Sequence, residues 1–585
     1  MILQQSIQFF ILWHWSILIN FFNDYLLNLA LSHAKSNLLV KLSRLLDFAP
    51  LEKLVDQYHH AAGPGSPVIH PARKLVRAIL VKYIYDLSLR EMEERLYSDM
   101  IIRWFVGYTL FDALPDHCTL ERFEIWLKDQ RHFSVFDEVL RQIKQDFPDE
   151  IRKTQIGDTY ALRANAASEE LRPMIRHVCT NILQAAIVAF PLLIDMSLSG
   201  FAWDQLLGMN KETTLPSKEE QAERLQRVVL AALELQRRIS ALLQEHTQQE
   251  FPVLRKQLAA LSKIIADEIS VIDQSVQRLP PKEQGSFRIG SATDIEASYR
   301  KHGPDPEDTS FGYNLQVAIS KTGFIHETRA YTGAVPDQTG VSDLISAQVE
   351  RQGSCPSKLI YDQAAGAGKT RADVERVSNG QTLLVSKLPD YEKNEVIFGS
   401  YDFKLSEDGK TLTCPNQQVS EIAYKSDSGD GRNFRFRHFQ CWQGRIPKGE
   451  KTPDLARRCP FWEKCRQPDQ GPRTMRLVFV SHYRKQVIDA QQYNDTELFL
   501  YEMKIRSRVE RVVFELTHYN GAHDCRRRRL DNADWQARMC STAYNLKHWV
   551  RRTDLRNARM AKALLHLSGP DTQKSRPRFG FLTSF

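Results

Sequence analysis

Apolar residues recur at helical spacing through the first part of the chain. Leu75, Ile79 and Tyr83 repeat every four positions with charged residues nearby, the pattern of a helix that packs one face into a core. Residues 88–91, Ser-Leu-Arg-Glu, have the types and spacing of a capping box at a helix start. Residues 37–150 are therefore predicted to form a compact helical domain.

A different pattern, of short apolar runs bounded by turn residues, marks strands later in the chain. Strands are predicted at residues 154–167, 311–320, 324–333, 359–361 and 381–387. A Lys-Thr-Gly turn separates the second from the third, which indicates an antiparallel hairpin. Helix-like stretches precede and follow the fourth, which is typical of parallel pairing. The order predicts an α/β fold with a mixed sheet, built from residues 151–167 and 285–388.

Two segments are predicted to interrupt this core. Residues 168–284 carry apolar residues at heptad-like spacing, which predicts a helical, coiled-coil-like insertion whose apolar stripe packs on itself. Residues 389–476 are rich in turns and form a small irregular insertion with four cysteines. Residues 477–552 return to helical patterning and complete the core, and residues 553–585 form a basic tail.

Length, charge and cysteine usage narrow the class of protein. A chain of 585 residues is too long for one core, so several domains are expected. A formal charge of +8 favours polyanionic partners. Nine scattered cysteines do not make a secreted disulfide framework, which favours a reducing cytoplasm. The apolar run at residues 7–22, within an extension spanning residues 1–36, is short for a membrane span. A buried helix, or a start codon placed too far upstream, is favoured over a membrane anchor.

The stretch Gly-Ala-Gly-Lys-Thr at residues 366–370 suggests a phosphate-binding loop. Such a loop requires an earlier glycine, and that position is Gln363, so the signal is weak. The strand before it ends at Asp362, at the edge where open α/β sheets bind ligands. From the local sequence, Asp362 is either a turn cap or a functional carboxylate.

Several short motifs occur along the chain in a specific order. They are Gly-Asp-Thr at residues 157–159, Ala-Asn at 164–165, Gly-Tyr-Asn with a following Gln at 312–316, Asp362 after a strand, and an arginine-rich run at 506–511. Together they resemble bacterial insertion-sequence transposases of the DDE, RNase H-like type. The helical pattern of the N-terminal domain is similar to the domain that precedes the catalytic core in that group.

The resemblance implies that Asp158, Asp362 and Glu510 are the catalytic acids and that they hold two Mg²⁺ or Mn²⁺ ions. Carboxylate oxygens suit Mg²⁺, and a pair of such ions promotes in-line attack on a phosphodiester. Only the arginine-rich context selects Glu510 from three nearby alternatives, which are Glu497, Glu502 and Glu515. Asp294 and Asp337 stay outside the predicted site, because turn or cap roles suffice for both.

The implied function is that of a transposase that cleaves the ends of its element and joins them to target DNA. The expected partners are the terminal inverted repeats, the target DNA and a second copy of the chain, in a bacterial cytoplasm near the nucleoid. A catalytically inactive or domesticated DNA-binding derivative is the main alternative. A nucleotide-driven enzyme that uses the loop at residues 366–370 is a third.

Basic residues are candidate DNA contacts. Arg506 precedes Glu510 by four positions, as in the family, but the family's Tyr and Lys positions hold Met503 and Thr517. Four consecutive arginines at residues 526–529 could replace that charge, with a solvated loop as the alternative. The predicted DNA-binding residues are Arg506, Arg508 and Arg511 near the third acid, and Arg73, Lys74 and Arg77 in the helical domain.

The irregular insertion contains a candidate zinc site. Four thiolates match the number that a structural zinc ion takes, although their spacing is loose and no pair is separated by two residues. The resemblance implies a cysteine cluster in this insertion, and the alternative is a set of small buried side chains. The predicted ligands are Cys414, Cys441, Cys459 and Cys465.

Overall fold

The computed structural model describes residues 27–567, apart from residues 60–67, 208–216, 247–249, 274, 302, 304, 306–307, 390–396, 426–428, 443–456, 467–470 and 472. The chain divides into two compact units. The first comprises Met1–Pro148, Phe514–His523 and Trp535–Phe585, and the second comprises Asp149–Val513 and Asp524–Asp534. The apolar run at residues 7–22 and the end of the basic tail, from residue 568, lie outside the described residues.

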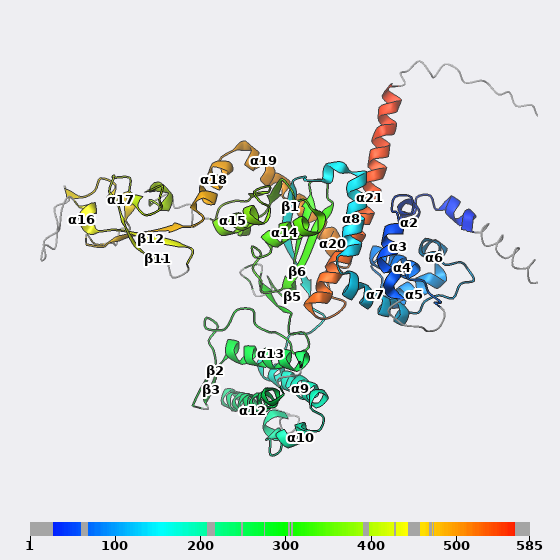
Figure 1. The fold of residues 1–585 in the computed structure, drawn as a ribbon, viewed down its shortest axis with the longest axis horizontal. Helices are drawn as coiled ribbons and strands as arrows, with labels where there is room; N and C mark the ends of the chain where they lie inside the picture. The colour runs from blue at the N-terminus through cyan, green and yellow to red at the C-terminus, as the bar shows by residue number, and fades with distance from the viewer. Residues whose placement is uncertain are drawn as a thin grey trace, which may run out of the picture. The chain divides into compact units, whose positions relative to one another are not determined.

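The first unit is helical, as predicted (Figure 1). Its N-terminal elements are α2 (Leu38–Leu42), α3 (Ala49–Val55), η1 (Asp56–Tyr58), α4 (Ala72–Ile84), α5 (Leu89–Ser98), α6 (Met100–Val106), α7 (His117–Arg131) and α8 (Ser134–Asp146). Leu75 and Ile79 are buried, which confirms the apolar face of α4. The capping box of α5 is present, with Ser88 N donating to Glu91 Oε2 at 2.7 Å and Glu91 N donating to Ser88 Oγ at 3.2 Å.

Two features stabilise the interior of this unit. Lys82 and Glu124, both buried, form an ion pair with Nζ 2.7 Å from Oε1, and the Tyr83 hydroxyl donates to the same carboxylate. The C-terminal helix α21 (Leu530–Leu567) contributes Trp549, whose Nε1 donates to Asp146 Oδ2 at 2.8 Å. The unit is therefore built from both ends of the chain.

The second unit contains a six-stranded mixed sheet (Figure 1). Its strands are β1 (Gln155–Arg163), β4 (Ser298–Lys301), β5 (Thr309–Ser320), β6 (Ile325–Thr332), β7 (Lys358–Ile360) and β8 (Leu383–Val385). The order is β4-β5-β1-β7-β8, and β6 also pairs with β5. β5 is antiparallel to β1 and β6, whereas β7 is parallel to β1 and β8. The predicted mixed α/β fold is confirmed, and β4 is a strand that the pattern did not predict.

Helices α14 (Val341–Gln352) and α15 (Gly368–Val377) share a core with one face of the sheet. Ala318, Leu359 and Leu384 are the buried strand residues in that core, which also contains Tyr361, the residue after β7. A short helix, η5 (Gln363–Gly366), connects the end of β7 to α15. Because side chains alternate along a strand, the residues next to these in sequence point to the other face.

The segment between β1 and β4 forms the predicted helical insertion. It comprises α9 (Leu171–Ala189), α10 (Ile194–Ser197), α11 (Trp203–Leu207), α12 (Lys218–Glu245), α13 (Pro252–Glu268), β2 (Ile269–Ile272) and β3 (Ser275–Arg278). Leu235 and Ile239 of α12 are buried in one cluster with Leu261 and Ile264 of α13. The apolar stripe therefore packs on the insertion itself, as predicted.

The remaining elements of the second unit follow β8. The cysteine-containing segment holds η7 (Ser400–Asp402), β9 (Lys404–Leu405), β10 (Leu412–Thr413), β11 (Glu421–Lys425), β12 (Gly431–Phe436), α16 (His438–Cys441), α17 (Trp462–Cys465) and β13 (Arg476–Ser481). Helices α18 (Arg484–Asn494), α19 (Glu497–Ile505) and α20 (Arg508–Tyr519) come next. No described helix is long and apolar enough to cross a membrane.

Candidate active site

Asp158 lies on β1 in the middle of the sheet, between β5 and β7. Its side chain is 19% exposed, and its Oδ1 accepts a hydrogen bond from the Thr159 N–H at 2.9 Å. The preceding residue is glycine because the ring of Tyr361 lies over it, and a Cβ atom at Gly157 would come within 2.5 Å of that ring. Packing beneath the strand thus holds the segment that carries Asp158.

Asp362 lies beside Asp158 because of the strand register. In the parallel pairing of β1 with β7, Ile156 is the partner of Ile360, and each acid follows two residues later. Neighbouring strands are about 4.8 Å apart, so Asp362, just after the end of β7, lies next to Asp158 within β1. Asp362 also caps η5, with its Oδ1 accepting from Ala364 N at 3.1 Å. The two roles that the local sequence left open are therefore compatible.

Glu510 approaches from the start of α20, and Arg506 joins it to the first acid. Arg506 Nη1 lies 3.5 Å from Asp158 Oδ2, and Arg506 Nη2 lies 3.4 Å from Glu510 Oε1. The pKa of Asp362 is raised, chiefly by burial, and the positive charge of Arg506 opposes this shift. Arg506 therefore contacts Asp158 and Glu510, and its field reaches Asp362.

Two of the other glutamates of this region have separate partners. Glu502 is buried and accepts hydrogen bonds from Lys358 Nζ at 2.8 Å and from the Tyr493 hydroxyl at 2.6 Å. Glu515 pairs with Arg551 at 2.7 Å within the first unit. Of these candidates, Glu510 is the one whose carboxylate faces the same guanidinium as Asp158.

Electrostatics distinguish these acids from ordinary surface carboxylates. Burial is the largest cause that raises the pKa of Asp158. The Thr159 N–H and Arg506 oppose this shift, while Asp362 and Glu510 add to it. Burial also raises the pKa of Asp362, and the next cause is the negative charge of Asp337. Mutual repulsion of this kind is typical of carboxylates arranged to bind a cation.

A buried polar network extends from the site. Arg300 Nη2 donates to Thr159 Oγ1 at 2.6 Å and contacts Asp337 Oδ1 at 3.3 Å. Asn314 Nδ2 donates to the same Asp337 oxygen at 2.8 Å, and Gln316 Nε2 donates to the Asp337 carbonyl at 2.7 Å. Arg300, Asn314 and Gln316 are buried. Asp337, predicted to be a turn or cap residue, therefore belongs to the surroundings of the site.

The sequence contained only part of the signal for this network. Asn314 and Gln316 are polar residues two positions apart in a fully buried strand, so they share one face. That placement indicates specific partners, since buried amides must be hydrogen-bonded. Arg300 lies on β4, a four-residue strand without clear alternation, and no sequence pattern identified it.

The donor set suits hard divalent cations, because carboxylate oxygens are the ligands that Mg²⁺ prefers. Among the described residues, no three His, Cys, Asp or Glu side chains form a group that could hold a metal ion as they stand. At the three acids, the Arg506 guanidinium occupies the space between Asp158 and Glu510. An ion shared by these two acids would have to displace it.

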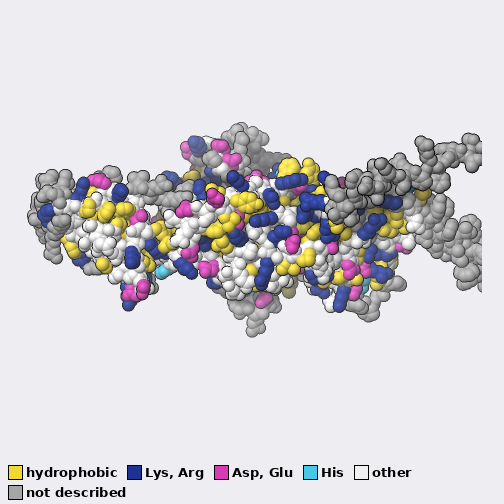
Figure 2. All heavy atoms as spheres, turned by 90° about the horizontal axis from the view of Figure 1, so that it is seen from above, with side chains coloured by type: hydrophobic (Ala, Val, Ile, Leu, Met, Phe, Trp, Pro, Cys, Tyr) yellow, Lys and Arg dark blue, Asp and Glu magenta, His cyan; other side chains and the backbone are white. Residues whose placement is uncertain are grey.

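Some of the predicted DNA-binding residues form ion pairs with carboxylates of the protein, and others are exposed. In the first unit, Lys74 pairs with Asp112 at 2.9 Å and Arg77 pairs with Glu52 at 2.5 Å, whereas Arg73 is exposed. In the second unit, Arg508 and Arg511 are exposed, and Arg508 Nη1 donates to a backbone carbonyl. Lys and Arg side chains are interspersed with acidic and apolar ones on the face in Figure 2.

The glycines at residues 366–370 have packing roles. A Cβ atom at Gly366 would come within 2.1 Å of the Lys387 carbonyl oxygen, and one at Gly368 within 2.8 Å of the Val487 side chain. Arg371 is buried and donates to the carbonyls of Gly366, Leu384 and Ser386. The backbone here is fixed by its own protein contacts.

All four predicted zinc ligands line one small cavity of about 30 Å³ in the cysteine-containing segment. Burial raises the pKa of the Cys459 and Cys465 thiols, and neighbouring cysteines raise them further. Arg466 Nη2 lies 3.1 Å from Cys441 Sγ. Residues far apart in sequence thus line one cavity, although no three of these described cysteines stand as a group that could hold a metal ion.

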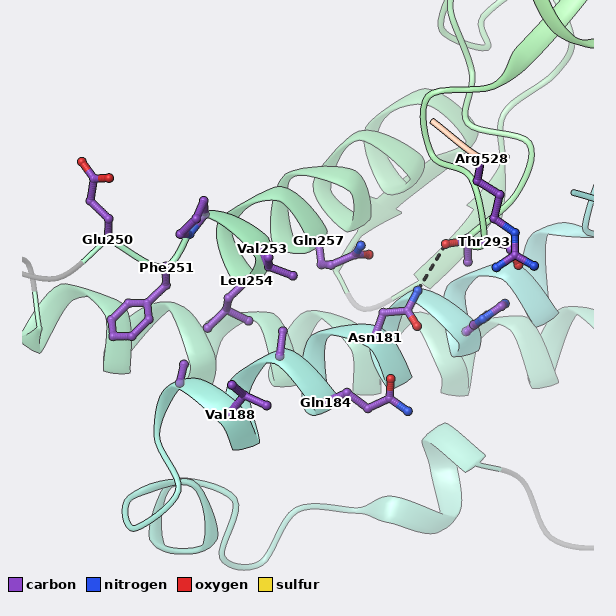
Figure 3. A pocket seen from close by; sticks show the side chains of 15 residues that line it. Asn181, Gln184, Val188, Glu250, Phe251, Val253, Leu254, Gln257, Thr293 and Arg528 are labelled. Carbon is purple, nitrogen blue, oxygen red and sulfur yellow. Dashed lines mark hydrogen bonds between the residues drawn. The ribbon is translucent and has the colours of Figure 1, made fainter. Parts of the chain in front are cut away.

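A cavity in the second unit is separate from the acids. It measures about 960 Å³ and lies in the helical insertion, between α9 and α13 (Figure 3). Its lining is apolar near Val188 and Phe251 and polar near Asn181, Thr293 and Arg528. None of the three predicted catalytic acids lines it.

Comparison with known families gives one match. Residues 29–125 match the transposase domain DUF772. No curated protein matches the chain. The family match covers most of the N-terminal helical domain and supports a transposase. It does not extend to the sheet or to the three acids.

Proposed function

We propose that this chain is a DNA transposase of the DDE, RNase H-like type, which cuts at the ends of its element and transfers them to target DNA. The observation that supports the proposal is that Arg506 contacts Asp158 and Glu510 while Asp362 lies just after the end of β7, the strand next to that of Asp158. The transposase domain match, in a different part of the chain, supports the same class. A mixed sheet in which β1 and β7 are parallel neighbours fits the RNase H-like topology.

In this proposal the three carboxylates would hold two Mg²⁺ or Mn²⁺ ions. When bound, such ions activate the attacking water or 3′-hydroxyl and stabilise the charge of the leaving oxygen. The Thr159 N–H keeps one oxygen of Asp158 oriented, and η5 does the same for Asp362. Arg506 exchanges its carboxylate contacts for a DNA phosphate, to which its forked guanidinium is suited.

The test is nicking of DNA that carries the element end, in the presence of Mg²⁺ or Mn²⁺. We expect activity in the wild type and its loss in Asp362→Asn. Asp373→Asn is the matched control, because this acid lies on α15 and pairs with Arg376. Equal activity in wild type and Asp362→Asn would reject the assigned site. Absence of nicking in both, with DNA binding retained, would favour the inactive DNA-binding derivative.

We also propose a structural zinc ion bound by Cys414, Cys441, Cys459 and Cys465. Its support is that all four line one cavity, with the thiols close enough to raise one another's pKa. Side-chain rotation would be needed to bring the sulfur atoms to the ~2.3 Å from zinc that such a site requires. Elemental analysis should find one zinc per chain, lost in Cys459→Ser and retained in Cys118→Ser, which replaces an exposed cysteine of the helical domain. Absence of zinc from the wild type would reject this site.

A synaptic complex of two element ends is proposed to contain two copies of the chain. Molar mass measured by light scattering should correspond to a dimer when end DNA is bound. A monomer on DNA under conditions that support strand transfer would contradict this part of the proposal.

A further inference from the structure

Four consecutive arginines, residues 526–529, lie in the part of the second unit that follows α20; we name them the arginine loop. The loop begins beside the end of β1. Cys525 N donates to the Arg163 carbonyl at 2.8 Å, and the Arg163 guanidinium forms two hydrogen bonds with Asp524, at 2.7 and 3.0 Å. The loop is therefore attached to the strand that carries Asp158.

Nearby side chains fix the backbone of the arginine loop. Asn165 Nδ2 donates to the Arg526 carbonyl at 2.9 Å. Asp294, which is buried, accepts from Arg529 N at 3.1 Å, and Glu296 accepts from Leu530 N at 2.7 Å. Both carboxylates thus bind backbone N–H groups of the loop. Asp294 was predicted to be a turn or cap residue, and its bond to the Arg529 N–H is of that kind.

Arg529 adopts a left-handed backbone conformation, with φ of +83°. A residue with a side chain is strained in this region, and such strain persists only where the surroundings enforce it. Here the enforcing contact is the bond from Arg529 N to Asp294, whose carboxylate also accepts from the Tyr313 hydroxyl at 2.6 Å. Strained residues of this kind cluster at ligand-binding positions.

Two of the arginine side chains extend into solvent. Arg528 is exposed, and its Nε lies 3.3 Å from the Asn165 carbonyl oxygen. Arg529 has a side chain 64% exposed and a 3.4 Å contact with Asp531, an exposed pair that solvent weakens. Figure 3 shows Arg528 beside Thr293, at the polar end of the insertion cavity.

We propose that the arginine loop binds backbone phosphates of the DNA that is cut at the three acids. This rests on the proposed function. A guanidinium donates several hydrogen bonds in a fixed fork that matches phosphate oxygens. The fixed backbone means that little conformational freedom of the loop is lost on binding. Charge complementarity, exposure and enforced strain all favour an anionic partner.

The strand also sets the distance between the loop and the cleavage site. Asp158 and Arg163 are five residues apart on β1. At about 3.3 Å per residue this is about 17 Å. One DNA strand carries a phosphate about every 3.4 Å along the helix axis, so the separation of Asp158 and Arg163 along β1 corresponds to about five phosphate spacings.

The test measures how binding of a labelled, mixed-sequence DNA duplex depends on salt. All the proteins compared carry Asp362→Asn, so that no cleavage occurs, and the one with no other substitution serves as wild type for the arginine loop. Each phosphate contact adds about 0.9 to the slope of log affinity against log salt concentration. The double variant Arg528→Gln, Arg529→Gln should lower this slope by about 2, because two contacts are lost. Arg528→Lys should retain most of it, since the charge remains.

The control removes the same charge elsewhere in this unit. Arg237 and Arg376 have exposed side chains paired with acids of their own helices, so Arg237→Gln with Arg376→Gln should leave the slope unchanged. Equal slopes in wild type and the arginine-loop variant would overturn the inference, as would an equal decrease in the control. Thermal unfolding identifies a variant that has not folded. If the double variant has not folded, the single variant Arg528→Gln tests the inference instead, with an expected decrease of about 1 in the salt slope. Failure of the nicking test leaves this result unaffected, so the two proposals fail separately.

Discussion

Replacing Arg506 by glutamine should strengthen the binding of divalent ions in the absence of DNA. The guanidinium lies 3.5 Å from Asp158 and 3.4 Å from Glu510, in the space that shared ions would enter. An ion must therefore compete with this positive charge. The variant keeps the length of the side chain and one hydrogen-bonding group but removes the competitor.

The size of the effect follows from the two contacts. Opposite charges about 3.5 Å apart attract by about 1 kcal/mol even at the dielectric constant of water. Glu510 is 60% exposed, so its share is below that value, whereas Asp158 is 19% exposed and its share is larger. A total of about 1–2 kcal/mol corresponds to about five- to thirtyfold tighter binding.

Calorimetric titration of Mn²⁺ into DNA-free protein measures this change directly. The solution should be mildly alkaline, because burial raises the pKa of Asp158 and Asp362 and protons would otherwise compete with the ion. Arg376→Gln removes one positive charge from α15 and controls for the general field of the protein. Unchanged or weaker Mn²⁺ binding in Arg506→Gln would refute the view that this guanidinium holds the place of the ions.

Three other substitutions test the surroundings of the site and the helical domain. Asp158→Asn should unfold at a higher temperature than wild type at pH 8 but not in acid. The pKa of Asp158 is raised in the folded chain, so the folded chain binds the carboxyl proton more tightly than the unfolded chain does. Ionisation of Asp158 therefore destabilises the wild type increasingly as pH rises through the folded pKa, and asparagine does not ionise. Glu124→Gln should lower the free energy of unfolding by about 3–5 kcal/mol, because Lys82 stays charged and buried without its ion pair. Denaturant unfolding measures this loss, and adding Lys82→Met to Glu124→Gln should restore part of the stability. Gly157→Ala should lower it by about 1–3 kcal/mol and slow nicking, since the new methyl displaces the Tyr361 ring.

The placement of Asp158 and Asp362 could be predicted only in part from strand patterns. Asp362 follows a short apolar run, whereas Asp158 lies inside its strand. The pattern did not specify that the strands carrying the two acids are neighbours. The observed register, in which Ile156 pairs with Ile360, places them opposite one another.

The third acid could not be placed by such rules. Glu510 lies on a helix, and its position depends on how α19 and α20 meet, which no local pattern specifies. Only the arginine-rich context, within the family resemblance, selected it from its neighbours. In the structure, the selection depends on tertiary partners, since Glu502 is occupied by Lys358 and Tyr493 while Glu510 faces Arg506. The polar network around Arg300 could not be predicted from local patterns either, because its members come from four separate segments of the chain.

The Gly-Ala-Gly-Lys-Thr stretch illustrates how one residue type serves different physical needs. Glycines bind phosphate when successive N–H groups curve around it, but they also occur wherever a Cβ atom would collide with another backbone. Gly366 meets the Lys387 carbonyl and Gly368 meets Val487 of α18, while Lys369 is exposed on α15. Close packing thus accounts for both glycines and holds the segment that follows Asp362. The motif therefore fixes the backbone that follows β7 and Asp362.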